Sequence, residues 1–230
     1  MRLLIGGPVG DGQIRDDLTD EELRALYEPP QLPWLRVNMV ATVDGAATGE
    51  GGKTGSINNP ADHRVFHLLR RTSDAIIVGA GTARTERYGA TDRPLVLVSR
   101  RGDVPEKLRD APAGSVLLAT CASAAGLSEA RKLLGDEQVL VLGEDSVDLA
   151  LLRAHLVDRD LRRLHCEGGP HLLRDLLAAG VVDEVDTTVV PRLIAGLHTR
   201  ITAGDGVDVP LSLGALLEED GTVLARWLVG

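Results

Sequence analysis

The sequence has few aromatic residues, few cysteines and no long apolar run. Aromatic side chains make up 2% of the 230 residues, which is too few for a surface on which nucleic-acid bases could stack. The net charge of −9 also argues against a nucleic-acid partner, because binding a polyanion depends on clustered lysines and arginines. No stretch approaches the ~20 apolar residues that span a bilayer, and the N-terminus lacks the apolar segment of a signal peptide. These absences predict a cytoplasmic protein with no nucleic-acid and no membrane partner.

The two cysteines, Cys121 and Cys166, each lie in or beside an apolar run. We therefore expect both to be small buried side chains and not a disulfide. The chain is 43% hydrophobic and 26% charged, as in ordinary globular proteins. A chain of this length buries roughly 70% of its unfolded surface, so one core can carry the fold without disulfides or metals.

Residues 1–33 are predicted to form an irregular arm around one short helix, with Thr19 as its N-cap and Pro29 and Pro30 after its end. The domain proper is expected over residues 34–230. There, short apolar runs rich in β-branched residues predict strands, and helical patterns separate several of them. These strands are expected at 36–42, 74–80, 94–99, 115–120, 138–143 and 161–168.

Apolar strands that alternate with helices imply a mainly parallel sheet covered on both faces. The clearest helix has Asn59 as its N-cap and Pro60 at its first position. Two further runs, 184–191 and 222–229, break the alternation, and we expect antiparallel strands there. The predicted fold class is a three-layer α/β/α domain with antiparallel strands at the C-terminal side of its sheet.

Ligands of open α/β sheets bind beyond the carboxyl ends of the strands, and four such places carry polar or glycine residues. The first strand ends in Asp44 and Gly45, although an Asp-Gly pair is more often a simple turn. After the second strand, glycines allow the backbone to approach a pyrophosphate, and Thr82 opens a helix whose N-terminus favours anions. Because Arg84 stands where a dinucleotide-binding motif would have its third glycine, a plain tight turn is the alternative.

The third place is Ser99 with Arg100, about twenty residues after Gly79. Cationic and hydroxyl groups there suit the 2′-phosphate of NADP, and a solvated basic turn is the alternative. In the fourth, glycines followed by Pro170 at a helix start predict an anion-binding turn. Glu167 would repel a phosphate at that turn, so we expect its carboxylate to face a substrate.

Two metal-like patterns are discounted. His63 and His67 are four residues apart, but no third ligand accompanies them. His165 and Glu167 match half of a zinc-deaminase signature, whose cysteine half is absent. No metal site is predicted.

Together the four places, in this order, resemble the pyrimidine reductases of riboflavin biosynthesis over residues 34–229. NMVATVDG resembles the first strand and turn of that family, and the helix with His67 and Arg70, followed by DAIIVGAGTARTE, resembles its second strand and glycine loop. CEGGPHLL and VVPRLIAG resemble two later turns. The resemblance implies a dihydrofolate-reductase-like fold, NADPH as hydride donor, a small heterocyclic substrate and a homodimer.

The reaction implied by the resemblance reduces a ribosylamino-pyrimidine 5′-phosphate to its ribitylamino form. It also implies roles for residues in the four places. Asp44 or Glu167 would relay a proton, and the substrate would meet Asn38, Thr42, Arg84 and Arg87. The dinucleotide would meet Gly79, Gly81, Thr82, Ser99, Arg100, Gly168, Gly169 and Pro170.

The sequence departs from the family on the substrate side. Asn38 stands where many fused members have lysine, and Glu86-Arg87-Tyr88 replaces a common D-x-P. The exact substrate is therefore left open, and reduction of dihydrofolate or another pterin is the enzymatic alternative. A non-catalytic NADPH-binding protein is the alternative from another class.

Overall fold

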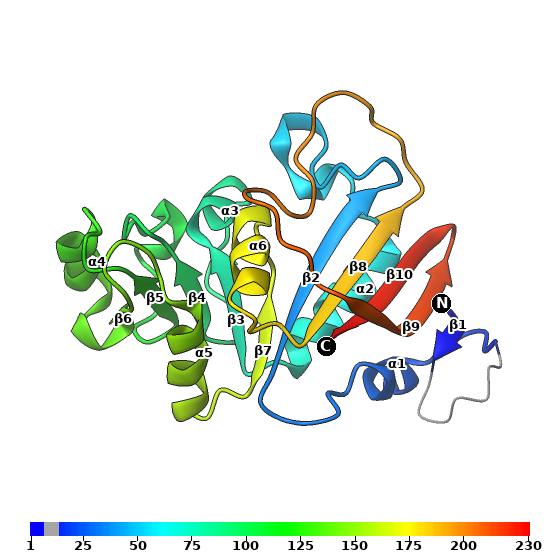
Figure 1. Cartoon of the computed structure of the whole chain (residues 1–230), viewed down its shortest axis with the longest axis horizontal. Coiled ribbons are helices and arrows are strands. Elements are labelled where there is room, and N and C mark those ends of the chain that lie inside the picture. The colour runs from blue at the N-terminus through cyan, green and yellow to red at the C-terminus, as the bar shows by residue number, and fades with distance from the viewer. Residues whose placement is uncertain (7–13) are drawn as a thin grey trace.

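A computed structural model describes residues 1–6 and 14–230, and Figure 1 shows one twisted sheet through the molecule. In the described part of the chain the sheet has the strand order β1-β9-β10-β8-β2-β7-β3-β4-β5-β6. The strands are β1 (Arg2–Gly6), β2 (Trp34–Thr42), β3 (Ala75–Gly79), β4 (Leu95–Val98), β5 (Val116–Thr120), β6 (Val139–Val141), β7 (Arg163–Cys166), β8 (Glu184–Val190), β9 (Leu211–Glu219) and β10 (Thr222–Val229).

The strands from β8 to β6 in this order run parallel, and β10, β9 and β1 pair antiparallel. The predicted mixed α/β fold with a mostly parallel sheet is confirmed. Of the two runs predicted as antiparallel strands, 222–229 forms the antiparallel β10, whereas 184–191 forms β8, which runs parallel to β2 and pairs antiparallel only with β10. The predicted irregular arm is wrong for Arg2–Gly6, which forms an edge strand beside β9. Its pairing depends on residues more than 200 positions away, such as Glu218 opposite Arg2, and no local pattern reports such a partner.

The helices are α1 (Asp20–Leu26), α2 (Pro60–Thr72), α3 (Ala80–Thr85), α4 (Leu127–Leu134), α5 (Leu149–Asp158) and α6 (Pro170–Ala178). Two predicted starts are confirmed. The Thr19 hydroxyl caps α1, and the Asn59 side chain caps α2 with Pro60 at the first position. Of the helices that the structure describes, none combines the length and apolar character needed to cross a membrane.

The helices cover both faces of the sheet. α5 and α6 pack on one face, in front of the sheet in Figure 1, and α2 lies behind it. Alternate residues of β3 separate the faces: Ala75 and Ile77 belong to the core under α5 and α6, whereas Ile76 and Val78 belong to the core with α3 and α4. Cys121 and Cys166 are buried free thiols, as predicted.

The face under α2 carries buried polar side chains. Leu35, Val37 and Met39 of β2 belong to the α5 and α6 core, so Arg36 and Asn38 point to the other face. Neighbouring strands continue this polar row, because Asn38 lies opposite Asp186 of β8. The apolar clusters of α1 with α2 and of α3 with α4 are separate on this face. Of this polar row, Asn38 reaches the site described below.

Candidate active site

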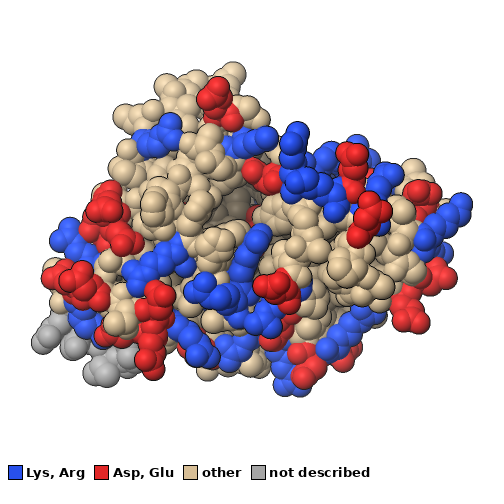
Figure 2. Space-filling view, turned by 180° about the vertical axis from the view of Figure 1, so that it is seen from behind, with Lys and Arg blue, Asp and Glu red and all other residues tan. Residues whose placement is uncertain are grey.

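Two hollows meet beyond the carboxyl ends of β3 and β7. The larger, of about 980 Å³, lies between the loop after β3, the start of α6 and the loop after β6. The smaller, of about 400 Å³, lies between α2 and the segment 86–91. Thr82 lines both. On the α2 side of the molecule, Figure 2 shows a hollow near the middle with Lys and Arg side chains around it.

Most of the predicted cofactor residues line the larger hollow, which we call the cofactor cleft. Two glycine turns come together there, because the Gly79 N–H donates to the Gly168 carbonyl at 2.8 Å. α6 starts at this point without a side-chain cap, and because Pro170 has no N–H, the backbone N–H groups of His171 and Leu172 are the ones without a partner within the helix. The predicted residues on its walls are Gly79, Gly81, Thr82, Arg100, Gly169 and Pro170.

The turn between the hollows has no room for side chains. Gly168 has φ +82°, and a Cβ there would lie 2.8 Å from the Met39 sulfur. A Cβ on Gly169 would collide with Thr82 Oγ1. The backbone of this turn therefore forms a bare surface that a flat or phosphorylated ligand can approach closely.

Ser99 does not face the cofactor cleft. It is buried, and its hydroxyl donates to Asp103 at 2.6 Å. Asp103 also pairs with Arg84 and, at 3.2 Å, with Arg101. Partial burial would raise the pKa of Asp103, but the Ser99 hydroxyl and the two guanidinium groups lower it. Of the two residues predicted for a 2′-phosphate, only Arg100 lines the cleft.

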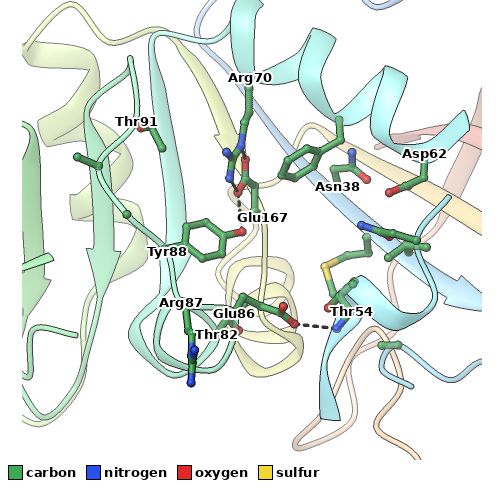
Figure 3. A pocket seen from close by; sticks show the side chains of 18 residues that line it. Asn38, Thr54, Asp62, Arg70, Thr82, Glu86, Arg87, Tyr88, Thr91 and Glu167 are labelled. Carbon is green, nitrogen blue, oxygen red and sulfur yellow. Dashed lines mark hydrogen bonds and ion pairs between the residues drawn. The ribbon is translucent and has the colours of Figure 1, made fainter. Parts of the chain in front are cut away.

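An ion pair stands at the centre of the smaller hollow, which we call the α2 cavity (Figure 3). Arg70 donates twice to Glu167, at 2.5 and 2.6 Å, and the Tyr88 hydroxyl donates to the same carboxylate at 2.6 Å. The Arg70 guanidinium also lies between the rings of Phe66 and Tyr88, 4.4 and 5.5 Å from their centroids. Both charges are thus held in one fixed position.

Glu167 is an anion at neutral pH. Burial would raise its pKa, but the hydrogen bonds and charge of Arg70, together with the nearby His165 ring, lower the pKa to about 2. The His165 Nε2 atom lies 3.4 Å from the carboxylate. Glu167 is therefore suited to stabilise positive charge in the cavity more than to donate a proton.

Asp44 is held in a loop contact outside the α2 cavity. Its carboxylate is hydrogen-bonded to the Thr42 hydroxyl and accepts from the backbone N–H groups of Ile194 and Ala195, at 3.1 and 2.7 Å. The Thr42 hydroxyl and these backbone donors lower the pKa of Asp44 to about 2. The structure therefore joins Asp44 and Thr42 to the segment 194–195, and neither lines the cavity.

The remaining predicted residues divide between the cavity and its surroundings. Asn38 and Arg87 line the cavity, and Figure 3 shows Arg87 extending away from the Arg70 and Glu167 pair. Arg84 does not line the cavity and forms an ion pair with Asp103. No group of three or more His, Cys, Asp or Glu side chains in the described ranges could hold a metal ion.

Several cavity residues were given no site role from the sequence. Three of them, Asp62, Phe66 and Arg70, are spaced by four residues and share one face of α2. That spacing was readable in the sequence, although nothing marked this face as the one over a cavity. Glu86 accepts from the Thr54 N–H at 2.7 Å and so joins two loops across the rim. The other missed residues of this kind are Asn58 and Tyr88.

Comparison with known proteins gives one consistent family. The model of the RibD C-terminal domain matches residues 33–220. A 2,5-diamino-6-ribosylamino-4(3H)-pyrimidinone 5′-phosphate reductase of Methanothermobacter thermautotrophicus is 32% identical over 76% of this chain and 86% of that protein. A protein of the same name from Archaeoglobus fulgidus is 30% identical over 71% and 83%. A pyrimidine reductase-like protein from Corynebacterium diphtheriae superposes with a TM-score of 0.79 at 24% identity, over 93% of this chain and 99% of that one.

Proposed function

The chain belongs to the RibD C-terminal domain family, and on that premise we propose that it reduces a ribosylamino-pyrimidine 5′-phosphate to the ribitylamino form with NADPH. Its curated relatives are reductases, and the chain is an oxidoreductase. The observation that carries the proposal is the junction at Thr82, which lines both the cofactor cleft and the α2 cavity. A donor in one hollow and an acceptor in the other would meet across the glycine turn.

The cofactor cleft fits a dinucleotide. Gly168 and Gly169 offer a surface that a Cβ would block, and the uncapped start of α6 suits a pyrophosphate. Arg100 and Arg174 are the arginines on its wall; Arg174 pairs with Asp175 at 3.0 Å, so Arg100 is the one we assign to a 2′-phosphate. A bound reduced nicotinamide supplies a hydride.

The chemistry required in the α2 cavity is reduction of an imine. Opening of the ribosylamine ring gives a C1′=N bond, and protonation of its nitrogen makes C1′ electrophilic. Hydride addition at C1′ then leaves a neutral secondary amine. The fixed anion of Glu167 stabilises the protonated imine, and Arg70 with Tyr88 holds that carboxylate in place.

The substrate phosphate requires a cation near the rim. Arg70 is committed to Glu167, so Arg87 is the arginine on the cavity wall that remains for an incoming anion in the part of the chain that the structure describes. Thr54 and Thr91 also line the cavity, on opposite sides of it in Figure 3, and the Thr54 hydroxyl can add a hydrogen bond.

The test follows NADPH oxidation by absorbance with a ribosylamino-pyrimidine 5′-phosphate and, in parallel, with dihydrofolate. Rapid oxidation with the ribosylamino compound alone, and a product heavier by two hydrogens, supports the proposal. Oxidation with dihydrofolate alone would make the enzyme a pterin reductase. Cofactor binding without turnover of either compound would indicate a non-catalytic NADPH-binding protein.

A further inference from the structure

The loop after β4 carries Arg100 and is fixed through its backbone. The Cys121 thiol donates to the Arg100 carbonyl at 3.3 Å, and the Gly126 N–H donates to the Arg101 carbonyl at 2.8 Å. The Arg100 side chain is exposed, lines the cofactor cleft and forms no ion pair with any residue that the structure describes. Its guanidinium is therefore available to a ligand, whereas the backbone that carries it is held in place.

One carboxylate closes this loop and joins it to α3. Asp103 accepts from the Ser99 hydroxyl at 2.6 Å, so the residues on either side of Arg100 are connected. The same carboxylate pairs with Arg84 in the last turn of α3, and with Arg101 at 3.2 Å. The first residues of α3 line the cofactor cleft. Asp103 therefore links the helix that follows the first glycine turn to the loop that carries Arg100.

Ser99 and Asp103 lie outside the lining of the cleft, so their effect on a bound dinucleotide has to pass through the residues that they hold. A long arginine side chain loses conformational entropy when it binds, and a fixed loop reduces the part of that cost that comes from the backbone. NADPH differs from NADH only in its 2′-phosphate, which is the group assigned above to Arg100. The position of this loop should therefore affect the binding of NADPH more than that of NADH.

We propose that Asp103 is a positioning residue that, through Ser99 and Arg84, fixes the loop carrying Arg100 and so sets the preference of the enzyme for NADPH over NADH. This inference rests on the proposed function, because it takes the cofactor cleft as the site of the dinucleotide. It also changes the role of Ser99. The sequence predicts a direct contact of Ser99 with the cofactor, whereas here Ser99 acts through Asp103.

The experiment measures the Kd of NADPH and of NADH by fluorescence titration for the wild type and for variants of the loop. Asp103→Asn keeps the size of the side chain and one acceptor for Ser99, but it loses the charge that pairs with Arg84. Ser99→Ala removes only the neutral contact, and Arg100→Ala removes the assigned phosphate contact. Asp110→Asn, at an exposed position outside the cleft lining, is the matched control. The unfolding midpoint of each variant establishes that it is folded, and turnover with each nucleotide is recorded separately.

The wild type is expected to bind NADPH about 10- to 100-fold more tightly than NADH, as hydrogen bonds between charged groups imply. Asp103→Asn should reduce this preference by about 3- to 10-fold, within the range of coupling between neighbours in one network, and should leave the Kd of NADH unchanged. Ser99→Ala should act in the same direction, and Asp110→Asn should keep the preference. In the Arg100→Ala background, Asp103→Asn should change neither Kd, because the side chain that it positions is gone.

An unchanged preference in folded Asp103→Asn, or a stronger one because the released arginines reach the phosphate, would overturn the inference and leave the proposed function in place. Equal weakening of both nucleotides, or a further loss of preference in the Arg100→Ala background, would overturn it too, because Asp103 would then not act through Arg100. Equal binding of both nucleotides by the wild type would remove the preference that Asp103 is proposed to set. Selective binding of NADPH without its oxidation by a ribosylamino-pyrimidine 5′-phosphate would instead contradict the proposed function and retain the role of Asp103.

Discussion

The cofactor cleft and the α2 cavity share Thr82, but they are built from different parts of the chain. The cleft is formed by short turns after β3 and β7, in which glycine backbone makes the contact surface. The cavity is formed by side chains from α2, β2 and the segment 86–91, and by Glu167, which follows β7. Its central contact joins Arg70 to Glu167, 97 residues apart in the sequence. The cleft therefore depends on the absence of side chains at its glycines. The cavity depends on contacts between side chains that are distant in the sequence.

This difference explains why the residues of the cleft were easier to predict from the sequence than those of the cavity. A glycine turn is local, so six of the eight residues predicted for the dinucleotide line the cleft. The cavity requires the strand order, which places β7 between β2 and β3 and sets Glu167 under α2. Substitutions in the two hollows should therefore differ in kind: loss of a charge partner should disturb the cavity, and gain of a methyl group should disturb the cleft.

The largest loss of folding stability is expected from Arg70→Met. It leaves the buried Glu167 carboxylate without its bidentate donor, and removal of one partner of a buried pair costs about 3–5 kcal/mol. Denaturant unfolding should show this loss, together with loss of NADPH oxidation. The exposed neighbour Arg71→Met is the control and should unfold like the wild type.

The double variant Arg70→Met with Glu167→Gln separates the effect of charge from the effect of packing, because it also removes the unpaired carboxylate. Its stability should return toward that of the wild type while its activity stays low. A double variant as unstable as Arg70→Met alone would show that the loss comes from packing against Phe66 and Tyr88 and not from charge.

A smaller effect on stability should appear as a function of pH. The pKa of Glu167 falls from an ordinary value of 4.5 to about 2 in the folded protein. The unfolded state therefore binds the proton first, so the contribution of Glu167 is complete above about pH 4.5 and is lost as the pH falls toward 2. Glu167→Gln should flatten the unfolding free energy across that window relative to the wild type. Parallel profiles for the two proteins would exclude Glu167 as a source of acid sensitivity.

The residues that prediction missed had partners which only the tertiary fold supplies. The pattern of apolar strands was sufficient to predict the parallel sheet. Asn59 and Pro60 were sufficient to predict the start of α2. The spacing of Asp62, Phe66 and Arg70 marks one face of a helix, but it does not say that His165 and Glu167 lie beneath it. Asp44 was predicted from its place after a strand, and its carboxylate binds backbone N–H groups 150 residues away.

Gly169→Ala tests the cleft. The added Cβ would meet Thr82 Oγ1, and crowding of this kind costs about 1–3 kcal/mol of folding stability. Because the Cβ would also cover backbone that the dinucleotide approaches, we expect weaker NADPH binding. Fluorescence titration of NADPH gives the Kd directly. Gly206→Ala adds the same methyl group where no atom lies within 4 Å and should leave the Kd unchanged. Thr82→Ala removes the Oγ1 atom, so if Thr82→Ala in the Gly169→Ala background fails to restore any affinity, the clash is not the cause.

The smallest expected effect separates two arginines of one segment. Arg87 lines the cavity, whereas Arg84 is held by Asp103, so only Arg87→Ala should weaken binding of a 5′-phosphate. An exposed charge contact is worth up to about 1 kcal/mol, which corresponds to a roughly fivefold rise in KM, and added salt should reduce the difference. The dephosphorylated substrate should show no difference between Arg87→Ala and the wild type. An equal rise in KM for Arg84→Ala would instead show that the phosphate also depends on Arg84, outside the α2 cavity, and would contradict its assignment to Arg87.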